Sequence, residues 1–332
     1  MNKRILILTH SADLHADLMV TMLRNKGAAP FRLNLDEFPR DFVINQDIKG
    51  SQWSGTISHI PSNDSVECAD IGAVWTRKNA DFTFVSDDLL PQEHVHAKQE
   101  TEHVLNSLLY SLDCYWINHP LALRSAMYKG EQSIRAAKMG FKVPASLISN
   151  QASAVRQFKA SLDGQMITKS MSNPFLGSDE VSAADRVVNG LNTTLITDEH
   201  MENIESVKEI PCYFQKYTPK EFELRVTVIG DRVFAAKIHS QDDERTKIDF
   251  RDFGANIRYQ AFELPADIRQ KCLDFVHSYQ LQYGAIDIIV TQNNEYVFLE
   301  NNPAGQFWFV QQLVPELTMM EALAERLIEG AK

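Results

Sequence analysis

Three oxygen-bearing side chains near the end of the sequence are of types that suit a divalent cation. Asp287 falls within an apolar, β-branched run, and Glu300 and Asn302 close a second such run beyond a polar turn at residues 291–295. This pattern predicts a β-hairpin. Because side chains alternate between the two faces of a strand, Glu300 and Asn302 should share a face, on which Asp287 can meet them from the neighbouring strand. Two carboxylates and an amide oxygen suit Mg²⁺, which takes its remaining ligands from water and substrate phosphates; the alternative is an ordinary hairpin with solvated acidic residues.

The composition is that of a globular chain. It has 332 residues, of which 44% are hydrophobic and 23% charged, and this length suggests two or three domains. The sequence has no apolar run of about 18 residues, the length of a membrane span, and the apolar stretch at residues 5–8 predicts a buried strand rather than a signal peptide. The four cysteines show no metal or redox spacing, which favours reduced thiols in a cytoplasm. The net charge of -11 argues against nucleic acid as a partner but allows a local basic pocket for phosphates.

Residues 1–118 predict an α/β domain, in which buried strands alternate with helices. Short apolar runs predict four strands, at residues 4–9, 30–34, 71–75 and 115–118. Helical periodicity predicts two helices, at residues 13–27 and 91–112, and the stretch between the second and third strands predicts a hairpin at residues 43–60.

Two lobes of the α+β class are expected to follow, over residues 119–211 and 212–332. In the first lobe we expect helices at residues 125–140 and 151–162 and strands at residues 143–148 and 165–169. In the second we expect long alternating strands at residues 222–229 and 232–240, the hairpin that carries Asp287, and a terminal helix at residues 315–329.

One candidate cation for a phosphate group comes directly before a turn-rich segment. Lys169 ends a predicted strand, and residues 170–178 are small and polar, as in a flexible flap. This placement lets the ammonium group and the loop amides meet the same anion. There is no Gly-rich phosphate-loop pattern in the sequence, so a solvated lysine at a strand end is the alternative.

A second candidate feature is a linker that can bind a nucleotide base. The segment Gln215-Lys216-Tyr217 ends an apolar strand shortly before a proline, and the backbone N–H and C=O groups of such a linker can pair with the edge of adenine. Glu223 follows, where its carboxylate can accept from ribose hydroxyls. Arg225 shares the face of Glu223 on the next strand, and Lys237 lies on the returning strand.

Taken together, these positions resemble the ATP-grasp superfamily over about residues 115–332. The resemblance rests on Lys129, Lys169 with its loop, residues 215–217, residues 223–225, and the spacing of Asp287, Glu300 and Asn302. It implies an ATP-grasp fold, with two lobes that clamp ATP and with Mg²⁺ held by Asp287, Glu300 and Asn302. It further implies that Lys129, Lys169, Gln215, Lys216, Tyr217 and Glu223 bind the nucleotide and that Arg225 and Lys237 act in catalysis. The implied reaction activates a carboxylate as an acyl phosphate, which an amine, hydroxyl or thiol then opens.

Further motifs resemble one branch of that superfamily, the ATP-grasp peptide maturases of the microviridin (graspetide) type. These motifs are LILTHSAD at residues 6–13, FRLNLD at 31–36, VWTRK at 74–78 and ENNPAGQFW at 300–308. The resemblance implies a precursor peptide with leader and core as substrate, and macrocycles that join Asp or Glu side chains to Ser or Thr as esters or to Lys as amides. The Thr-His-Ser motif resembles the ester-forming branch, and relatives imply a homodimer.

Two regions are candidates for peptide binding. The family implies that a leader helix docks on the central lobe, and residues 186–207 are our candidate surface; a structural hairpin is the alternative. Phe307, Trp308 and Phe309 could line a peptide groove or belong to the core.

Two other functions are compatible with the same site. One is a small-substrate ligase of the glutathione-synthetase or ribosomal-modification type, which would show activity with free amino acids. The other is a non-catalytic ATP-binding regulator, which would bind nucleotide without turnover; the presence of both lysines and all three candidate metal ligands argues against it.

Overall fold

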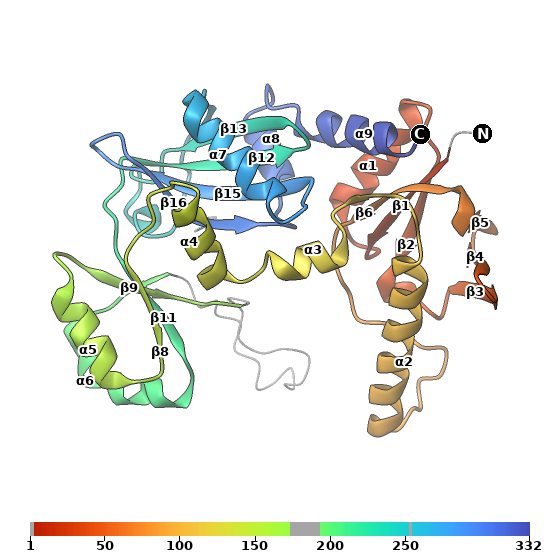
Figure 1. Ribbon diagram of the computed structural model, residues 1–332, viewed down its shortest axis with the longest axis horizontal. Coiled ribbons are helices and arrows are strands. Elements are labelled where there is room, and N and C mark those ends of the chain that lie inside the picture. Colours follow the sequence, from red (N-terminus) through yellow and green to blue (C-terminus); the bar gives the residue numbers. More distant parts are fainter. Residues whose placement is uncertain (1–2, 173–192, 252–253) are drawn as a thin grey trace.

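The computed structural model describes residues 3–172, 193–251 and 254–332, and it divides into an N-terminal α/β domain and two sheet-containing lobes (Figure 1). The N-terminal domain lies at one end of the molecule, and the two lobes lie one above the other at the other end. Most of the flap segment expected at residues 170–178, and residues 186–192 of the candidate leader surface, lie outside the described residues.

The N-terminal domain is built on a parallel sheet with the strand order β2-β1-β6-β7. Its strands are β1 (Arg4–Thr9), β2 (Pro30–Asn34), β6 (Ile71–Thr76) and β7 (Tyr115–Ile117). They are apolar runs because helices or loops cover both faces of a parallel sheet. Two helices accompany the sheet, α1 (Leu14–Asn25) and α2 (Pro91–Tyr110). The strands and helices expected from the sequence are confirmed here.

A small antiparallel sheet packs against this domain. It consists of β3 (Phe42–Lys49), β4 (Gln52–His59) and β5 (Asp64–Glu67), with the short 3-10 helices η1 (Leu35–Glu37) and η2 (Cys68–Asp70) at its margins. Phe42, Ile57 and Val66 from its three strands join the buried cluster of the parallel sheet. The hairpin predicted at residues 43–60 is therefore confirmed.

Two helices lead from the N-terminal domain into the lobes, where the sequence predicted one helix at residues 125–140. These helices are α3 (Pro120–Ser125) and α4 (Lys129–Lys138). The helical stretch begins earlier than the sequence predicted, at Pro120. Proline in the first turn of a helix is a start signal, and the side chain of His119 caps this turn. The break at residues 126–128 separates a helix beside the N-terminal domain from one that packs on the C-terminal lobe.

The central lobe is an antiparallel sheet with the order β10-β9-β11-β8. It consists of β8 (Ser146–Ser149), β9 (Met166–Lys169), β10 (Thr194–Leu195) and β11 (Cys212–Lys216), with α5 (Ala152–Ser161), α6 (Asp198–Glu202) and η3 (Ile204–Glu209). The sequence placed β11 in the next lobe, which is wrong, because β11 pairs with both β8 and β9. The central lobe therefore extends to Lys216.

The C-terminal lobe contains an antiparallel sheet with the strand order β14-β13-β12-β15-β16. They are β12 (Phe222–Ile229), β13 (Arg232–Ile238), β14 (Tyr259–Ala261), β15 (Tyr283–Val290) and β16 (Tyr296–Asn302). The accompanying helices are η4 (Glu244–Thr246), α7 (Ala266–His277), α8 (Trp308–Leu313) and α9 (Met319–Gly330). The last helix returns to pack on α1 and β6, so both ends of the chain lie at the N-terminal domain (Figure 1).

Within the described residues, no helix combines the length and the apolarity needed to cross a membrane.

Candidate functional site

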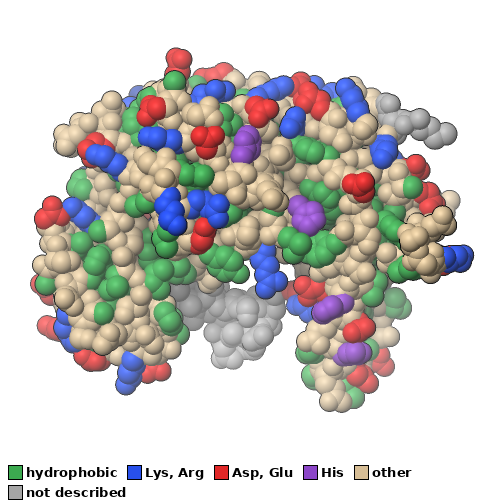
Figure 2. All heavy atoms as spheres, in the orientation of Figure 1, with side chains coloured by type: hydrophobic (Ala, Val, Ile, Leu, Met, Phe, Trp, Pro, Cys, Tyr) green, Lys and Arg blue, Asp and Glu red, His purple; other side chains and the backbone are tan. Residues whose placement is uncertain are grey.

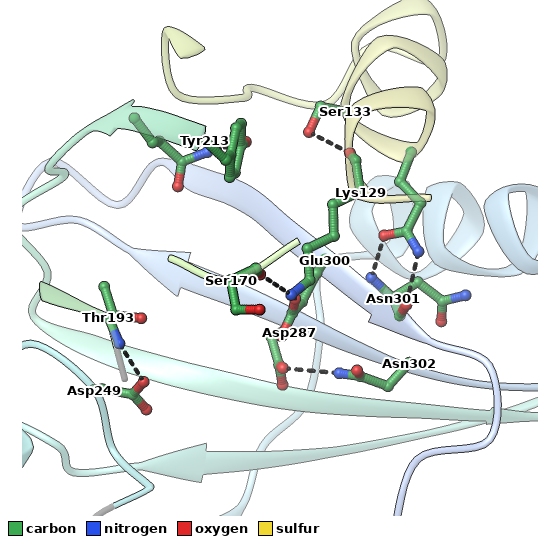
Figure 3. Close-up of polar contacts among 12 residues, drawn as sticks. Lys129, Ser133, Ser170, Thr193, Tyr213, Asp249, Asp287, Glu300, Asn301 and Asn302 are labelled. Atoms are coloured by element: carbon green, nitrogen blue, oxygen red, sulfur yellow. Dashed lines mark hydrogen bonds and ion pairs between the residues drawn. The ribbon is translucent and has the colours of Figure 1, made fainter. Parts of the chain in front are cut away.

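The three oxygen-bearing residues lie on one face of the β15–β16 hairpin. Asp287 is the direct cross-strand partner of Glu300, and the Asn302 amide donates to Asp287 Oδ2 at 3.2 Å (Figure 3). Both carboxyl residues are only 8% exposed, so the alternative of solvated acids is wrong. The common face of Glu300 and Asn302 is the one that strand periodicity predicts, and Asp287 meets it from the neighbouring strand.

An irregularity in this hairpin places one additional residue at the pocket between the two lobes. Asp287 pairs with Glu300 while the next residue, Ile288, pairs with Phe298, so Leu299 is an extra residue, as in a β-bulge. Leu299 and Glu300 both line the pocket between the two lobes. The bulge therefore places an apolar wall next to a charged group, an arrangement that strict alternation does not produce.

Four cations surround the carboxylates. The Lys129 ammonium lies 3.4 Å from Glu300 Oε2 and donates to the backbone carbonyl of Ser170 at 2.6 Å (Figure 3). Arg225 Nη1 donates to Asp287 Oδ1 at 2.8 Å. Lys169 and Arg251 complete the set, since both contribute to the electrostatic environment of Glu300.

The two carboxylates differ in how well their charges are compensated. Burial raises the pKa of Glu300, but Lys169, Lys129 and Arg251 together outweigh burial and hold the pKa below its usual range. Burial raises the pKa of Asp287, Arg225 offsets only part of this rise, and the negative charge of Glu300 adds to it. A divalent cation between the two groups would relieve this repulsion, so the site fits a metal.

The donor set also fits a metal that keeps part of its water. Among the described residues there is no cluster of three or more His, Cys, Asp or Glu side chains able to enclose an ion. Two carboxylates and one amide oxygen leave several coordination positions open for water and phosphate oxygens, which is typical of Mg²⁺.

The pocket beside this site runs between the central and C-terminal lobes. Lys169, residues 215–217, Glu223, Asp287 and Glu300 all line it, as the sequence predicted for a nucleotide site. The backbone N–H groups of Lys216 and Tyr217 are engaged, however, since they donate to the carbonyls of Ala145 and Gln165 at 2.8 Å each. The expectation that these N–H groups are free to pair with a base is therefore wrong, because they belong to the hydrogen bonding of the central lobe.

Glu223 is buried at the pocket wall and has a partner that sequence reasoning missed. The Lys220 ammonium donates to Glu223 Oε1 at 2.7 Å and to the carbonyl of Ile248 at 3.0 Å. Burial raises the pKa of Glu223, and Lys220 opposes this shift. The pair presents a fixed polar group to the pocket, and Lys220 lies only three residues before Glu223 in the chain.

The structure does not place Lys237 at the site. Its cross-strand partner is Leu224, whereas Arg225 pairs with Ala236, so Lys237 and Arg225 lie on opposite faces of the sheet. The Lys237 ammonium instead lies 3.9 Å from the centre of the Phe222 ring. The expected catalytic role of Lys237 is wrong, because its side chain is directed toward the apolar side of the sheet.

A loop after η4 contributes an ion pair to the pocket that the sequence did not indicate. Arg251 Nη2 donates to Asp249 Oδ2 at 2.6 Å, and both residues line the pocket. Burial opposes the Asp249 charge, yet its bonds to Arg251 lower the pKa of Asp249 to about 2. The segment has no periodicity, so only the fold could place Arg251 near the carboxylates.

The aromatic residues after β16 are mainly structural. Phe307 is 1% exposed and packs against His15 and Tyr283. Of the two alternatives that the sequence offered for Phe307, the core position is therefore confirmed. Trp308 and Phe309 are half-buried against the same core, and Phe309 makes an edge contact with Tyr259.

Comparison with known protein families gives one match, to the "MvdD pre-ATP grasp domain" over residues 4–124. The match covers the N-terminal domain, including the Thr-His-Ser motif. Among curated proteins, no match was found.

Comparison with solved structures gives matches over nearly the whole chain. A RiPP-associated ATP-grasp ligase of Chryseobacterium gregarium, in complex with ADP and a leader and core peptide, is 29% identical with a TM-score of 0.89, over 98% of this chain and 97% of the other. The macrocyclase MdnC of Microcystis aeruginosa, bound with precursor peptide MdnA, is 27% identical with a TM-score of 0.84, over 98% and 99%. The macrocyclase MdnB of the same organism is 28% identical with a TM-score of 0.80, over 99% and 100%.

Proposed function

Because the chain is an ATP-grasp ligase of the graspetide-maturase type, we propose that it closes macrocycles in a ribosomally made precursor peptide at the expense of ATP. The observation that carries the proposal is the buried Asp287–Glu300 pair, with Asn302, at the end of an interlobe pocket that Lys169 also lines. The peptide complexes recorded for two of the similar proteins support a peptide rather than a free amino acid as substrate.

In this proposal the nucleotide lies in the interlobe pocket. Residues 215–217 flank the base, which can pair with their carbonyl oxygens or with the backbone beyond Tyr217. Glu223, held by Lys220, accepts from the ribose hydroxyls. Lys169 and Lys129 meet the phosphates, since both lie beside Glu300 and therefore beside the metal ligands.

Asp287, Glu300 and Asn302 would hold Mg²⁺, which when bound supplies positive charge that neutralises the phosphates. Arg225, fixed by Asp287 and by the carbonyl of Gln306, stays close enough to stabilise negative charge on the transferred phosphoryl group. Burial between two lobes strengthens each of these interactions because water is excluded.

The proposed chemistry balances as a dehydration driven by ATP. A carboxylate oxygen of an Asp or Glu side chain of the peptide attacks the γ-phosphorus, and the bond to the β-phosphate oxygen breaks to release ADP. The hydroxyl of a Ser or Thr of the same peptide then attacks the acyl carbon, loses its proton, and displaces inorganic phosphate. We favour the ester because of the Thr-His-Ser motif, and a lysine amine in place of the hydroxyl would give an amide.

The leader of the precursor is proposed to dock on the central lobe, on the described part of residues 186–207. This part contains β10, α6 and the start of η3. Among the described strands, β10 lies at the edge of the central sheet, where a partner can approach it.

The test is a reaction with ATP, Mg²⁺ and two peptides, MdnA and the product of any short reading frame beside the gene of this chain. We expect each ring to remove the mass of one water and to release one ADP. Consumption of ATP with free amino acids, without a dehydrated peptide, would identify a small-substrate ligase. Nucleotide binding without turnover would identify a regulator.

A further inference from the structure

Helix α4 carries a lysine of the candidate site, Lys129, as its first residue. We propose that Tyr279, just beyond α7, is a positioning residue for nucleotide binding. It holds α4 through a pair of charged residues, Glu131 and Arg135, and thereby keeps the Lys129 ammonium beside the phosphates. The inference rests on the proposed nucleotide site and names a residue outside that site on which its geometry depends.

The sequence of α4 gives its first turn little stability of its own. The helix has ten residues, and helices this short are marginal when isolated. Gly130, a poor helix former, is its second residue, and the N-cap residue Tyr128 makes no side-chain capping bond within the described part of the chain. Lys129 therefore depends on tertiary contacts of α4 for its position.

Two adjacent faces of α4 contact the C-terminal lobe. Lys129 and Gln132, three positions apart, share the face toward β16, where Lys129 Nζ lies 3.4 Å from Glu300 Oε2. Glu131 and Arg135, four positions apart, share the face toward the end of α7. The first face carries the ammonium group of the site, and the second face anchors the helix.

The anchor is built around the Tyr279 ring. The Arg135 guanidinium carbon lies 4.0 Å from the centre of this ring, and Arg135 Nη1 donates to the carbonyl and hydroxyl oxygens of Ser278 at 3.2 Å each. The Tyr279 hydroxyl donates to Glu131 Oε2, and Arg135 Nη2 lies 2.7 Å from Glu131 Oε1. Each oxygen of the Glu131 carboxylate thus has its own partner, which fixes the turn of α4 that follows Lys129.

Tyr279 can serve as a fixed point because it belongs to the core of the C-terminal lobe. It is 5% exposed and makes an edge contact with Phe275 at 5.5 Å between ring centres. Burial raises the pKa of Tyr279, and the bond to Glu131 raises it further, so the phenol keeps its proton at neutral pH and donates. Removal of the hydroxyl frees one oxygen of Glu131 and leaves this face of α4 to the partly exposed Arg135.

The anchor lies at the outer surface of the molecule rather than in the interlobe pocket. On the face shown in Figure 2, Lys, Arg, Asp and Glu side chains gather over α4 and α7. The described residues that line the interlobe pocket include neither Tyr279 nor the two charged residues of the anchor. A substitution at Tyr279 therefore leaves the pocket lining unchanged and can reach the nucleotide only through α4.

The experiment measures ADP affinity by calorimetry with excess Mg²⁺, for four full-length proteins: the wild type, Tyr279→Phe, Lys129→Met and the double variant. We expect Tyr279→Phe to weaken ADP binding about threefold, within the range of one hydrogen bond. Lys129→Met should weaken it about tenfold, because a charged contact to the phosphates is lost. The double variant should bind ADP as Lys129→Met does, because Tyr279 acts through Lys129.

A matched control is Tyr115→Phe, since the Tyr115 hydroxyl donates to Gln282 Oε1 at 2.7 Å, outside the anchor. This variant should lower the melting temperature as Tyr279→Phe does, with the ADP affinity of the wild type. On the helix side, Glu131→Gln keeps an oxygen for the phenol and should bind ADP as the wild type does. Glu131→Ala should reproduce the loss seen in Tyr279→Phe.

Three outcomes would overturn the inference. They are wild-type ADP affinity in Tyr279→Phe, an equal loss in Tyr115→Phe, and the same loss when Tyr279→Phe is added to the wild type or to Lys129→Met. None of these measurements needs turnover. If all results are as expected but no precursor is dehydrated, the proposed ligase function is wrong and the role of Tyr279 stands.

Discussion

The side-chain amide of Gln132, on α4, pairs with the backbone of Asn301, on β16. Gln132 Nε2 donates to the Asn301 carbonyl at 2.9 Å, and the Asn301 N–H donates to Gln132 Oε1 at 2.8 Å. Asn301 lies between the candidate metal ligands Glu300 and Asn302, and Asn118 donates to the carbonyl of Pro303 at 3.0 Å, just beyond them. Two buried amides from outside the C-terminal sheet therefore hold the backbone on which the ligands are mounted.

Replacement of Gln132 by leucine should weaken metal-dependent nucleotide binding. It leaves the Asn301 N–H and carbonyl groups without partners, a loss of about 1–3 kcal/mol in the free energy of unfolding, and lets the ligand strand shift. The measurement is calorimetric binding of ADP with and without Mg²⁺. The increase in ADP affinity that Mg²⁺ produces should fall, and the affinity without Mg²⁺ should not change.

The control for this effect is Gln311→Leu, because the Gln311 carbonyl oxygen likewise accepts a backbone N–H bond, from Met320 at 2.8 Å, away from the site. It should lower the thermal stability without changing the gain due to Mg²⁺. If Mg²⁺ increases the ADP affinity equally in the wild type, Gln132→Leu and Gln311→Leu, the role of Gln132 is only structural.

Glu300→Gln should reduce product formation by about a hundredfold or more while the protein stays folded. The substitution removes one of the two carboxylates of the site but keeps its shape, so the metal and the phosphates are misplaced. Thermal melting checks the fold, and peptide mass spectrometry measures the product. Wild-type turnover at saturating Mg²⁺ would rule out the metal assignment.

Lys169→Met should raise the KM for ATP more than it lowers kcat. In the proposed site its cation contacts the phosphates in both the ground state and the transition state, and would therefore contribute uniform binding. Lys237→Met provides a matched lysine on the opposite face of the C-terminal sheet, and its kinetics should be those of the wild type. If Lys169→Met and Lys237→Met raise the KM for ATP equally, the conclusion that Lys237 lies outside the nucleotide site is wrong.

The stability of the N-terminal domain should fall in mild acid because of His15. Burial, aided by Arg77, lowers the pKa of His15 to about 4 from 6.5. Below pH 6.5 the unfolded chain binds a proton that the folded chain does not, so stability falls with falling pH until about pH 4. Between pH 7 and 5 the loss should be about 2 kcal/mol. His15→Gln should show a smaller fall in the melting temperature over this range than the wild type.

Removal of the leader from a precursor should slow cyclisation, because the reacting side chains alone offer little surface to anchor. Adding the leader as a separate peptide should restore part of the rate if it favours an active conformation. Equal rates for leaderless and full-length precursors would contradict leader recognition by the central lobe.

Much of the site follows from local sequence alone. Alternation along a strand determines that Glu300 and Asn302 share a face, whereas the bulge at Leu299 brings Asp287 to that face, since in the register of Ile288 with Phe298 Asp287 would pair with Leu299. The position of Lys237 was also available in the sequence. A two-residue turn after Ile229 makes Leu224 the partner of Lys237 and thereby excludes it from the face of Arg225.

Tertiary structure alone decided which distant groups meet that face. The pairing of Arg225 with Asp287, the bulge at Leu299 and the approach of Arg251 depend on strand order, register and loop packing, which have no local pattern. Gln132 and Asn301 are 169 positions apart, and nothing in either segment indicates the other. The sequence by itself determined the ligand types and the common face of Glu300 and Asn302. The bulge, the packing of α4 and the lobes determined that Asp287 joins that face and how the ligands are held, because only contacts between distant elements exclude water and fix the backbone there.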